Sequence, residues 1–343
     1  MRQLLNTLYV TVPDSYLASD GEDVEVIIDK KVMAKLPLQN FEAIVSFGYS
    51  GMSPSLMQKC LDHGIAVSFM TQNGRLKVRV VGKPTGSVYL RKTQFKVSMD
   101  EQASLKIAKN LILGNTYNQR WIIERFLRDH PLNGDRQRLK AASLDLKTGL
   151  QTILSAQTKD QLRGIEGNLA TIYFSVFDDL IIRQKKDFYF KTRNRRPPLD
   201  FTNTLLSFSY SLLANDCAAA LAANGLDPYV GFMHVDRPGR ESLALDMMEE
   251  LRAVMVDRFV LKLINLKIMT ALDIVQKPNG ACLLKEQARK KLITQWQNGK
   301  QIEITHPYLK EKMKWGLVPF LQAQLLARYL RGDLDEYPPF FWK

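Results

Sequence analysis

The chain has 343 residues, 45% of them hydrophobic, which is long and apolar enough for two folded domains and excludes a disordered polypeptide. Its 48 Lys and Arg against 35 Asp and Glu give a net charge of +13, which favours an anionic partner, either nucleic acid or an anionic membrane surface. No stretch approaches the ~18 uninterrupted apolar residues of a membrane-spanning helix, and the first residues lack the apolar core and cleavage site of a signal peptide. We therefore expect a cytoplasmic protein that acts on nucleic acid and has no membrane partner.

Alternating apolar and β-branched residues predict strands in the first ~85 residues of the chain. The predicted strands cover residues 4–12, 24–28, 32–36, 43–47, 66–70 and 76–81. Turn signals such as Asn73-Gly74 separate them, and helical spacing predicts one helix over residues 54–63 that packs on the sheet. This part of the chain is predicted to be a small β-rich domain.

The pattern changes to a helical period after residues 82–86, where two glycines and a proline indicate a linker. The sequence therefore predicts an α+β protein, with a small β-rich domain over residues 1–88 and a larger all-α domain over residues 89–343. The helices are predicted over residues 97–113, 116–128, 139–157, 162–182, 199–224, 242–270, 280–297 and 307–331. Residues 337–342 are aromatic but interrupted by two prolines, so we expect a strap packed against the body.

Three acids lie on one face of the predicted helix 242–270, because Glu249 and Glu250 follow Asp246 by three and four residues. Like charges so placed cost roughly 0.2–0.5 kcal/mol on an isolated helix. The cost rises if they are desolvated, unless a cation lies beside them. Arg252 or a metal ion could supply that cation. The alternative interpretation is a solvated acidic face.

His234 precedes Glu249 by 15 residues, and the turn-forming residues 236–239 lie between them, so a loop can fold back and bring the imidazole over the acids. A lone histidine in an apolar setting is otherwise more often a core residue. Glu166 lies between Gly164 and Gly167, whose small size leaves room for a ligand such as a DNA backbone. A glutamate near a helix start could instead serve the helix dipole. Carboxylates, an imidazole and a polyanion-seeking surface together indicate phosphodiester chemistry.

Residues 183–196 interleave seven cations with three aromatics, a composition in which cations contact phosphates and rings stack on bases or fill the core beneath. A solvated basic loop is the alternative. The candidate DNA contacts are Arg193, Arg195, Arg196, Arg237, Lys285 and Arg289. No P-loop, HExxH or GxSxG motif occurs. The three cysteines are far apart and indicate neither a disulfide framework nor a CxxC zinc site.

The chain carries these residues in an order that resembles the CRISPR-associated spacer-acquisition integrases, the Cas-one family. The ordered signals are Glu166, Ala170, Tyr173-Phe174, Arg195-Arg-Pro-Pro198, Asn203, Tyr210, Gly225-Leu-Asp-Pro228, Gly231-Phe-Met-His234, Asp246-Met-Met-Glu-Glu-Leu-Arg252, Gln322-Ala323 and Tyr337-Pro338. The resemblance covers essentially the whole chain, because a β-rich front and a helical back are also that family's two domains. Each signal is weak alone, and the ordered set is specific.

The resemblance implies three catalytic metal ligands, which are Glu166, His234 and Glu249. It implies three supporting residues, which are Asp246, Tyr210 and Arg252. Carboxylate and imidazole ligands suit Mg²⁺ or Mn²⁺ as the cofactor. Glu250 is expected to be a bystander to this site.

The activity implied by the resemblance is that of a metal-dependent DNA integrase or endonuclease of CRISPR adaptation, in which the 3′-hydroxyl of a short donor duplex attacks a phosphodiester in the repeat array. One phosphodiester is exchanged for another, so the step needs no ATP, in agreement with the absent P-loop. Joining both donor ends requires two active sites, so a homodimer is expected. The small partner Cas-two would bridge homodimers, the N-terminal domain would serve in dimerisation and DNA contact, and local details favour the type I-C branch, where a Cas-four nuclease takes part.

Two other hypotheses remain open from the sequence. A stand-alone metal-dependent nuclease, acting on branched DNA in repair, would share the metal site and release cut DNA without joining it. A non-enzymatic nucleic-acid scaffold would use the acids only for structure.

Overall fold

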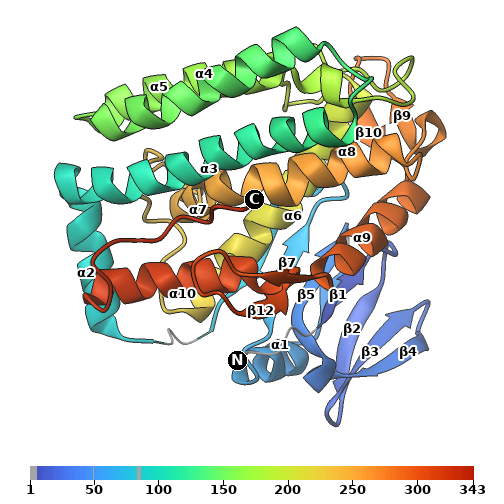
Figure 1. Ribbon diagram of the computed structural model, residues 1–343. Coiled ribbons are helices and arrows are strands. Elements are labelled where there is room, and N and C mark those ends of the chain that lie inside the picture. The colour runs from blue at the N-terminus through green and yellow to red at the C-terminus, as the bar shows by residue number, and fades with distance from the viewer. Residues whose placement is uncertain (1–5, 49, 83–85) are drawn as a thin grey trace. The chain divides into compact units, whose positions relative to one another are not determined.

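The computed structural model describes residues 6–48, 50–82 and 86–343, and the chain divides into two compact units (Figure 1). The first, here called the β unit, contains Met1–Thr85, Lys285–Ile304 and Met313–Leu317. The second, here called the helical unit, contains Gly86–Leu284, Thr305–Lys312 and Val318–Lys343. A β-rich N-terminal part and a mostly helical remainder confirm the predicted α+β fold class.

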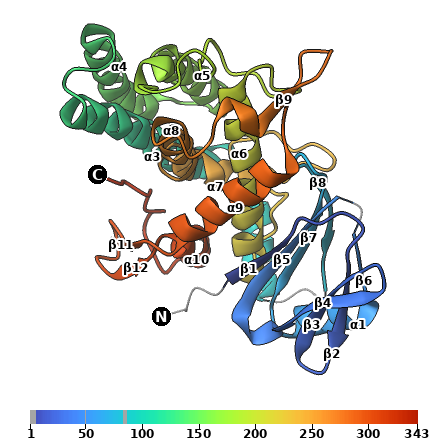
Figure 2. The ribbon, with the colours of Figure 1, turned by 90° about the vertical axis from the view of Figure 1, so that its right-hand side faces the viewer.

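Two four-stranded sheets with the strand orders β1-β5-β7-β8 and β4-β3-β2-β6 form the β unit (Figure 2). The strands are β1 (Asn6–Val10), β2 (Tyr16–Asp20), β3 (Asp23–Ile28), β4 (Lys31–Pro37), β5 (Phe41–Phe47), β6 (Gly51–Met52), β7 (Ala66–Met70) and β8 (Leu76–Val80). The single turn η1 (Leu38–Asn40) precedes β5. Helix α1 (Pro54–Asp62) begins after Ser53, whose hydroxyl accepts a hydrogen bond from the Leu56 amide, and it buries Leu56 and Cys60 in the unit's core.

The six predicted strands correspond to β1, β3, β4, β5, β7 and β8, and the predicted helix to α1. Strands β2 and β6 were not predicted. Only Leu17 of β2 is fully buried, so this strand lacks the apolar alternation that marks a strand in the sequence, and β6 is too short to carry a pattern. Part of the predicted first strand and most of the predicted linker 82–86 lie outside the described residues.

The predicted division into residues 1–88 and 89–343 differs from the observed one, because α9 (Glu286–Lys300) belongs to the β unit. Within that unit Gln297 Nε2 donates to the Thr7 carbonyl at 2.8 Å, and Arg289 donates to the Gln72 carbonyl at 2.7 Å. Periodicity reveals that a helix has an apolar face, but it does not reveal which unit that face packs on.

The helical unit is built mainly of long helices, with α3 lying between α4 on one side and α7 on the other (Figure 1). Its helices are α2 (Val88–Met99), α3 (Glu101–Asp129), α4 (Arg136–Ser155), α5 (Lys159–Ser175), α6 (Phe201–Ala223), α7 (Ser242–Arg252), α8 (Arg258–Asn265) and α10 (Val318–Arg331). A π-helical segment, η3 (Ala253–Asp257), joins α7 to α8. Shorter elements are η2 (Phe177–Leu180), η4 (Ala271–Asp273), β9 (Ile274–Gln276) and β10 (Cys282–Leu284). The remaining short elements of the chain are β11 (Glu303–Thr305), β12 (Lys312–Lys314) and η5 (Trp315–Leu317).

Each predicted helix overlaps an observed helix, but several boundaries were wrong and α2 was not predicted. Predicted helices 97–113 and 116–128 are the single helix α3, which starts where the Asp100 carboxylate accepts hydrogen bonds from the amides of Gln102 and Ala103. The predicted helix 242–270 is divided by η3. The predicted helices 280–297 and 307–331 begin with strand residues rather than with helix.

Helix α6 is long and apolar enough to cross a membrane by length and composition, with a mean hydropathy of 1.3 over its most apolar window. The core helices of soluble proteins meet the same criterion. In the structure 61% of that window is buried, and α6 packs against α7 and α10 within the helical unit. Helix α6 is therefore a core helix of this unit.

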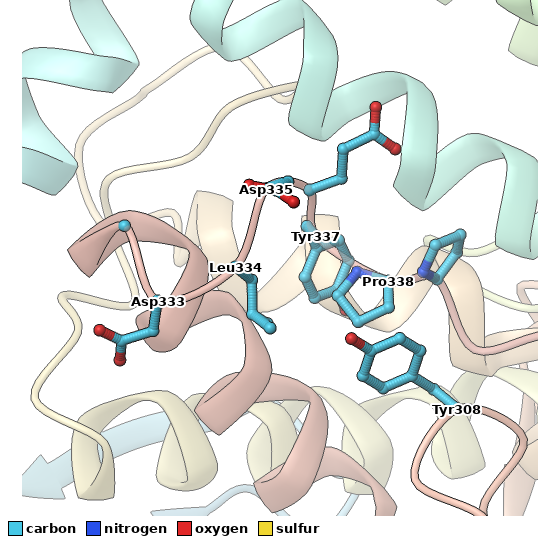
Figure 3. Close-up of a pocket in the computed structure, with 9 residues that line it drawn as sticks. Tyr308, Asp333, Leu334, Asp335, Tyr337 and Pro338 are labelled. Atoms are coloured by element: carbon cyan, nitrogen blue, oxygen red, sulfur yellow. The ribbon is translucent and has the colours of Figure 1, made fainter.

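Residues 337–342 form the expected strap, here called the C-terminal strap, which runs between α10 and α3 (Figure 1). Tyr337 and Phe340 are fully buried, and Asn110 and Asn118 of α3 donate to their carbonyls, each at 2.8 Å. A pocket of about 350 Å³ lies where the strap begins, lined by Tyr308 and residues 332–339 (Figure 3). None of the candidate site residues lines this pocket.

Candidate active site

Helix α5 carries Glu166 well inside the helix and not at its start. The Thr158 hydroxyl accepts from the Gln161 amide and begins the helix, so Glu166 lies about two turns further on. This placement removes the helix-dipole explanation for Glu166, since that effect is confined to the first turn. A Cβ atom built on Gly164 or Gly167 would have no neighbour within 4 Å, so the helix surface beside Glu166 is open.

Asp246 of α7 fixes the loop that carries His234. Its buried carboxylate accepts hydrogen bonds from the amides of Phe232 (2.6 Å), Met233 (2.9 Å) and His234 (2.9 Å). It also contacts His234 Nδ1 at 2.7 Å, which leaves Nε2 as the outward-facing nitrogen of the ring. The loop therefore folds back onto the acidic helix as the spacing predicted, and Asp246 orients the imidazole.

Gly231 lets this loop approach α7 closely. A Cβ atom at this position would lie 2.8 Å from Asp246 Oδ2 and 2.8 Å from Ser242 Cβ, which is closer than real Cβ contacts. Any larger residue would push the loop away from the carboxylate. The glycine in the Gly-Phe-Met-His run is thus required by packing.

Glu249 lies between an arginine, an amide and the imidazole. Its Oε1 accepts from Arg252 Nη2 at 2.5 Å, and its Oε2 accepts from Asn115 Nδ2 of α3 at 3.2 Å. His234 Nε2 is 4.0 Å from Glu249 Oε1. Glu249 is only 3% exposed, so a solvated acidic face is wrong for this part of α7. In this conformation Arg252 is the cation that the acids require.

Glu166 is half-buried and electrostatically coupled to α7. Burial raises the pKa of its carboxyl first, and the charge of Glu249 raises it further, whereas Arg252, His234 and Arg195 act in the opposite direction. Burial lowers the pKa of His234, but the Asp246 carboxylate and then Glu249 outweigh this effect and the net shift is upward. Both side chains therefore feel the negative charge of Glu249, which a bound cation would offset.

The described residues contain no group of three His, Cys, Asp or Glu side chains close enough together to hold a metal ion in this conformation. Two buried atoms nevertheless lack hydrogen-bond partners at the cluster: the acceptor Asn115 Oδ1 and the donor Arg252 Nε. Buried polar atoms are normally satisfied. Unsatisfied atoms beside two carboxylates and an imidazole therefore fit a site that is completed by a cation and an anionic ligand.

Tyr210 packs beside Arg252 and is hydrogen-bonded to Asp257. The Tyr210 hydroxyl donates to Asp257 Oδ1, and the guanidinium carbons of Arg193 and Arg252 lie 5.2 Å and 5.6 Å from the Tyr210 ring centroid. Burial raises the pKa of Asp257 to about 7, against the opposing hydrogen bond from Tyr210. Sequence reasoning missed Asp257 and Asn115. Asp257 could have been found as a charged residue inside the apolar run of η3. Nothing in the sequence around Asn115 indicated its role.

Glu250 faces away from Glu249 and holds the C-terminal strap. It accepts hydrogen bonds from the Tyr337 hydroxyl, from the Phe340 amide at 3.0 Å and from Gln322 Nε2 at 3.1 Å. Burial raises its pKa to about 7 in spite of these donors. Glu250 is not part of the cluster of Glu166, His234 and Glu249, and it is a fully buried structural anchor.

The six candidate DNA contacts fall into two groups. Arg195, Arg196, Arg237 and Lys285 are exposed, and Arg195 is close enough to lower the pKa of Glu166. Arg193 and Arg289 instead make hydrogen bonds within the protein. Arg193 donates to Asn203 Oδ1 at 2.7 Å and to Ser207 Oγ at 3.1 Å. Arg289 is only 5% exposed and bonded within the β unit, because its long apolar stem is packed.

Solved structures of other proteins share this fold. A casposase bound to integration product superimposes with a TM-score of 0.83 over 98% of this chain and 93% of the casposase chain, at 24% identity. A Cas6-RT-Cas1–Cas2 complex gives a TM-score of 0.83 over 100% of this chain and 36% of that chain, at 23% identity. The fold is therefore the one shared by the casposase and Cas1 structures.

The sequence comparisons identify the family. The profile of CRISPR associated protein Cas1 matches residues 8–298, and this chain belongs to that family. The CRISPR-associated endonuclease Cas1 2 of Rhodospirillum rubrum is 47% identical over 100% of both chains. A CRISPR-associated exonuclease Cas4/endonuclease Cas1 fusion of Geobacter sulfurreducens is 34% identical over 97% of this chain and 60% of the fusion.

Proposed function

We propose that this protein is a metal-dependent DNA integrase and endonuclease of CRISPR adaptation, which inserts short duplex DNA into the repeat array. The observation that carries the proposal is the convergence of Glu166, His234 and Glu249 around Arg252 in a member of the Cas1 family. The names of the Cas1 endonuclease relatives and the fold shared with a casposase support it.

In this proposal Glu166, His234 Nε2 and Glu249 hold Mg²⁺ or Mn²⁺, since two carboxylates and an imidazole suit either ion. Binding requires Arg252 to release Glu249 Oε1, which it occupies now. Once bound, the ion would polarise the target phosphodiester and stabilise the charge that develops on it. Asp246 keeps Nε2 directed toward the ligand position.

The reaction exchanges one phosphodiester for another. The donor 3′-oxygen forms a bond to the target phosphorus, the bond from phosphorus to the target 3′-oxygen breaks, and the hydroxyl proton passes to that leaving oxygen. The Arg252 guanidinium, which lies against the Tyr210 ring, would stabilise negative charge on the reacting phosphate. No external energy source is needed, because the bonds formed and broken are equivalent.

A donor has two ends, so two active sites must act together and we propose a homodimer in the cytoplasm. The β unit would supply dimerisation and DNA contacts. The solved complex of related fold contains Cas2, and the Geobacter relative is fused to Cas4. These comparisons support Cas2 as the bridging partner and Cas4 as a further one. Lys285, Arg195, Arg196 and Arg237 are the proposed contacts to donor and target DNA.

The proposal is tested by incubating the protein and Cas2 with a labelled 3′-hydroxyl duplex, supercoiled repeat DNA and Mn²⁺. We expect covalent donor–target products, and a Glu166→Ala variant should reduce joining at least about 100-fold while still binding DNA, because a removed ligand abolishes the ion's contribution. The matched control is Glu241→Ala, which removes a carboxylate just before α7 and outside the cluster.

A donor that ends in a 3′-deoxy nucleotide separates the proposal from the alternative function. Products that require the 3′-hydroxyl indicate joining. Cut DNA without joined products, with either donor, would support the stand-alone nuclease instead. Unchanged activity of Glu166→Ala would exclude the proposed ligand set.

A further inference from the structure

Two arginines and a tryptophan form a cluster on the helical unit that the proposed chemistry does not use. The guanidinium carbons of Arg125 (α3) and Arg258 (α8) lie 3.6 Å and 4.4 Å from the ring centroid of Trp342, at the end of the C-terminal strap. These three residues are called the arginine cluster. The strap fixes the tryptophan, since the Trp342 amide donates to Asn118 Oδ1 at 2.9 Å.

The arginine cluster carries two positive charges, and neither belongs to an ion pair among the described residues. The neighbouring Asp129 is bound by Arg128 at 2.7 Å and 3.2 Å. Partial desolvation of the two guanidinium groups lowers their pKa, and the charge of Arg128 on Arg125, and of Arg125 on Arg258, lowers it further, whereas Asp129 acts in the opposite direction on Arg125. The indole face offsets part of this repulsion. A bound anion would offset the remainder.

The cluster lies along the same two helical segments as the candidate metal centre. Asn115, which holds Glu249, precedes Arg125 by ten residues on α3, and Glu249 precedes Arg258 by nine residues on the α7–η3–α8 segment that packs beside α3. At a rise of ~1.5 Å per residue, the cluster is about 14–15 Å further along both segments. B-form DNA advances ~3.4 Å per base pair, so this distance corresponds to about four base pairs.

We propose that the arginine cluster binds a backbone phosphate of the DNA, about four nucleotides from the phosphodiester at the candidate centre. The inference rests on the proposed function. A phosphate presents two oxygens that match the paired N–H groups of a guanidinium, and such a contact reads no sequence. Arg258 and Lys262, one turn later on α8, are both exposed, so the positive charge continues along this face. That continuity favours a polyanion over a single carboxylate of a protein partner.

The experiment measures the affinity of the full-length protein for a fluorescein-labelled 3′-hydroxyl duplex across a series of NaCl concentrations. We expect Arg125→Ala and Arg258→Ala each to weaken binding about tenfold, and the double variant to reduce the slope of log affinity against log salt by about 1, at ~0.9 per phosphate contact. Arg128→Ala removes the same charge from the same helix but from a residue already paired with Asp129. It should stay within about twofold of the unmodified protein.

Lysine variants test whether a loss of binding in the alanine variants comes from misfolding rather than from the lost guanidinium. Arg125→Lys and Arg258→Lys keep the charge and lose the planar fork, so they should retain most of the salt slope and bind about threefold or more weakly. A double alanine variant with unchanged affinity and slope would overturn the assignment.

Two further outcomes separate a failure of the proposed function from a failure of the phosphate proposal. Absence of DNA binding by the unmodified protein would contradict the proposed function itself. A double variant that binds DNA normally but no longer assembles with Cas2 would assign the cluster to a protein partner and overturn the phosphate proposal.

Discussion

At the residue scale, Asp246 shows how one buried side chain organises the candidate site. Its two oxygens accept three backbone amide hydrogen bonds and contact the imidazole, so one carboxylate binds both the loop residues 232–234 and the ring. Carboxylates that orient a ligating histidine set the direction of its free nitrogen. Asp246 is therefore a positioning residue, although it lies on the same helical face as Glu249.

The change Asp246→Asn tests this role. The asparagine side chain has one acceptor oxygen where the carboxylate has two, so at least one of the loop amides loses its acceptor. We expect the free energy of unfolding to fall by about 2–4 kcal/mol. Affinity for Mn²⁺ should fall about 10- to 100-fold, because the imidazole is no longer oriented. Calorimetric Mn²⁺ titration and thermal unfolding measure the two effects. The control is Asp145→Asn, which changes an exposed acid of α4 outside this loop. Unchanged Mn²⁺ affinity in a less stable variant would make Asp246 purely structural.

At the element scale, the C-terminal strap is hydrogen-bonded to both α7 and α3 and holds them together. Glu250 receives three donors from the strap and α10, and Asn118 of α3 donates both to the Glu250 carbonyl and to the Phe340 carbonyl, each at 2.8 Å. A Cβ atom on Gly114 of α3 would lie 2.9 Å from Glu250 Cβ, so the two helices are in close contact at this point. The strap thus fixes the helix that also presents Glu249.

Stability should depend on the protonation of Glu250. Its folded pKa is raised from 4.5 to about 7, so the folded state keeps a proton that the unfolded state has lost. This contribution is fully present below pH ~4.5 and is lost as the pH rises to ~7, and its size is on the order of 3 kcal/mol. The stability of the unmodified protein relative to Glu250→Gln should therefore decline from pH 5 to pH 8, as measured by thermal unfolding. Glu336→Gln, on an exposed neighbour, should show no such decline.

Local elements were predictable from sequence because their signals are local. Apolar alternation placed β3, β5 and β7, and helical spacing placed α1. The contact between Asn115 and Glu249 joins positions 134 residues apart, and that between Phe340 and Glu250 joins positions 90 apart. No periodicity records such pairings. The resemblance of ordered motifs named Glu166, His234 and Glu249, whereas their supports Asn115 and Asp257 emerged only from the packed structure.

At the scale of the whole molecule, sequence order and structural unit do not coincide. Helix α9 follows the long helical unit in the chain and yet belongs to the β unit. Its buried residues are Ala288, Arg289, Leu292, Ile293, Trp296 and Lys300. Helix α9 packs against β1 and η5 of the β unit. The β unit is therefore complete only after most of the chain has been made.

The change Trp296→Ala tests this dependence. Trp296 is 3% exposed, so its truncation should cost about 3–5 kcal/mol, and the loss should fall on the β unit to which α9 belongs. Hydrogen exchange should accelerate in β1, β5 and β7, while α3 and α6 keep their protection, because each unit has its own core. Leu330→Ala in α10, a buried residue of the helical unit, should give the reverse pattern. Equal acceleration in both units after either change would show that the two cores unfold as one, and that α9 stabilises the molecule as a whole rather than the β unit.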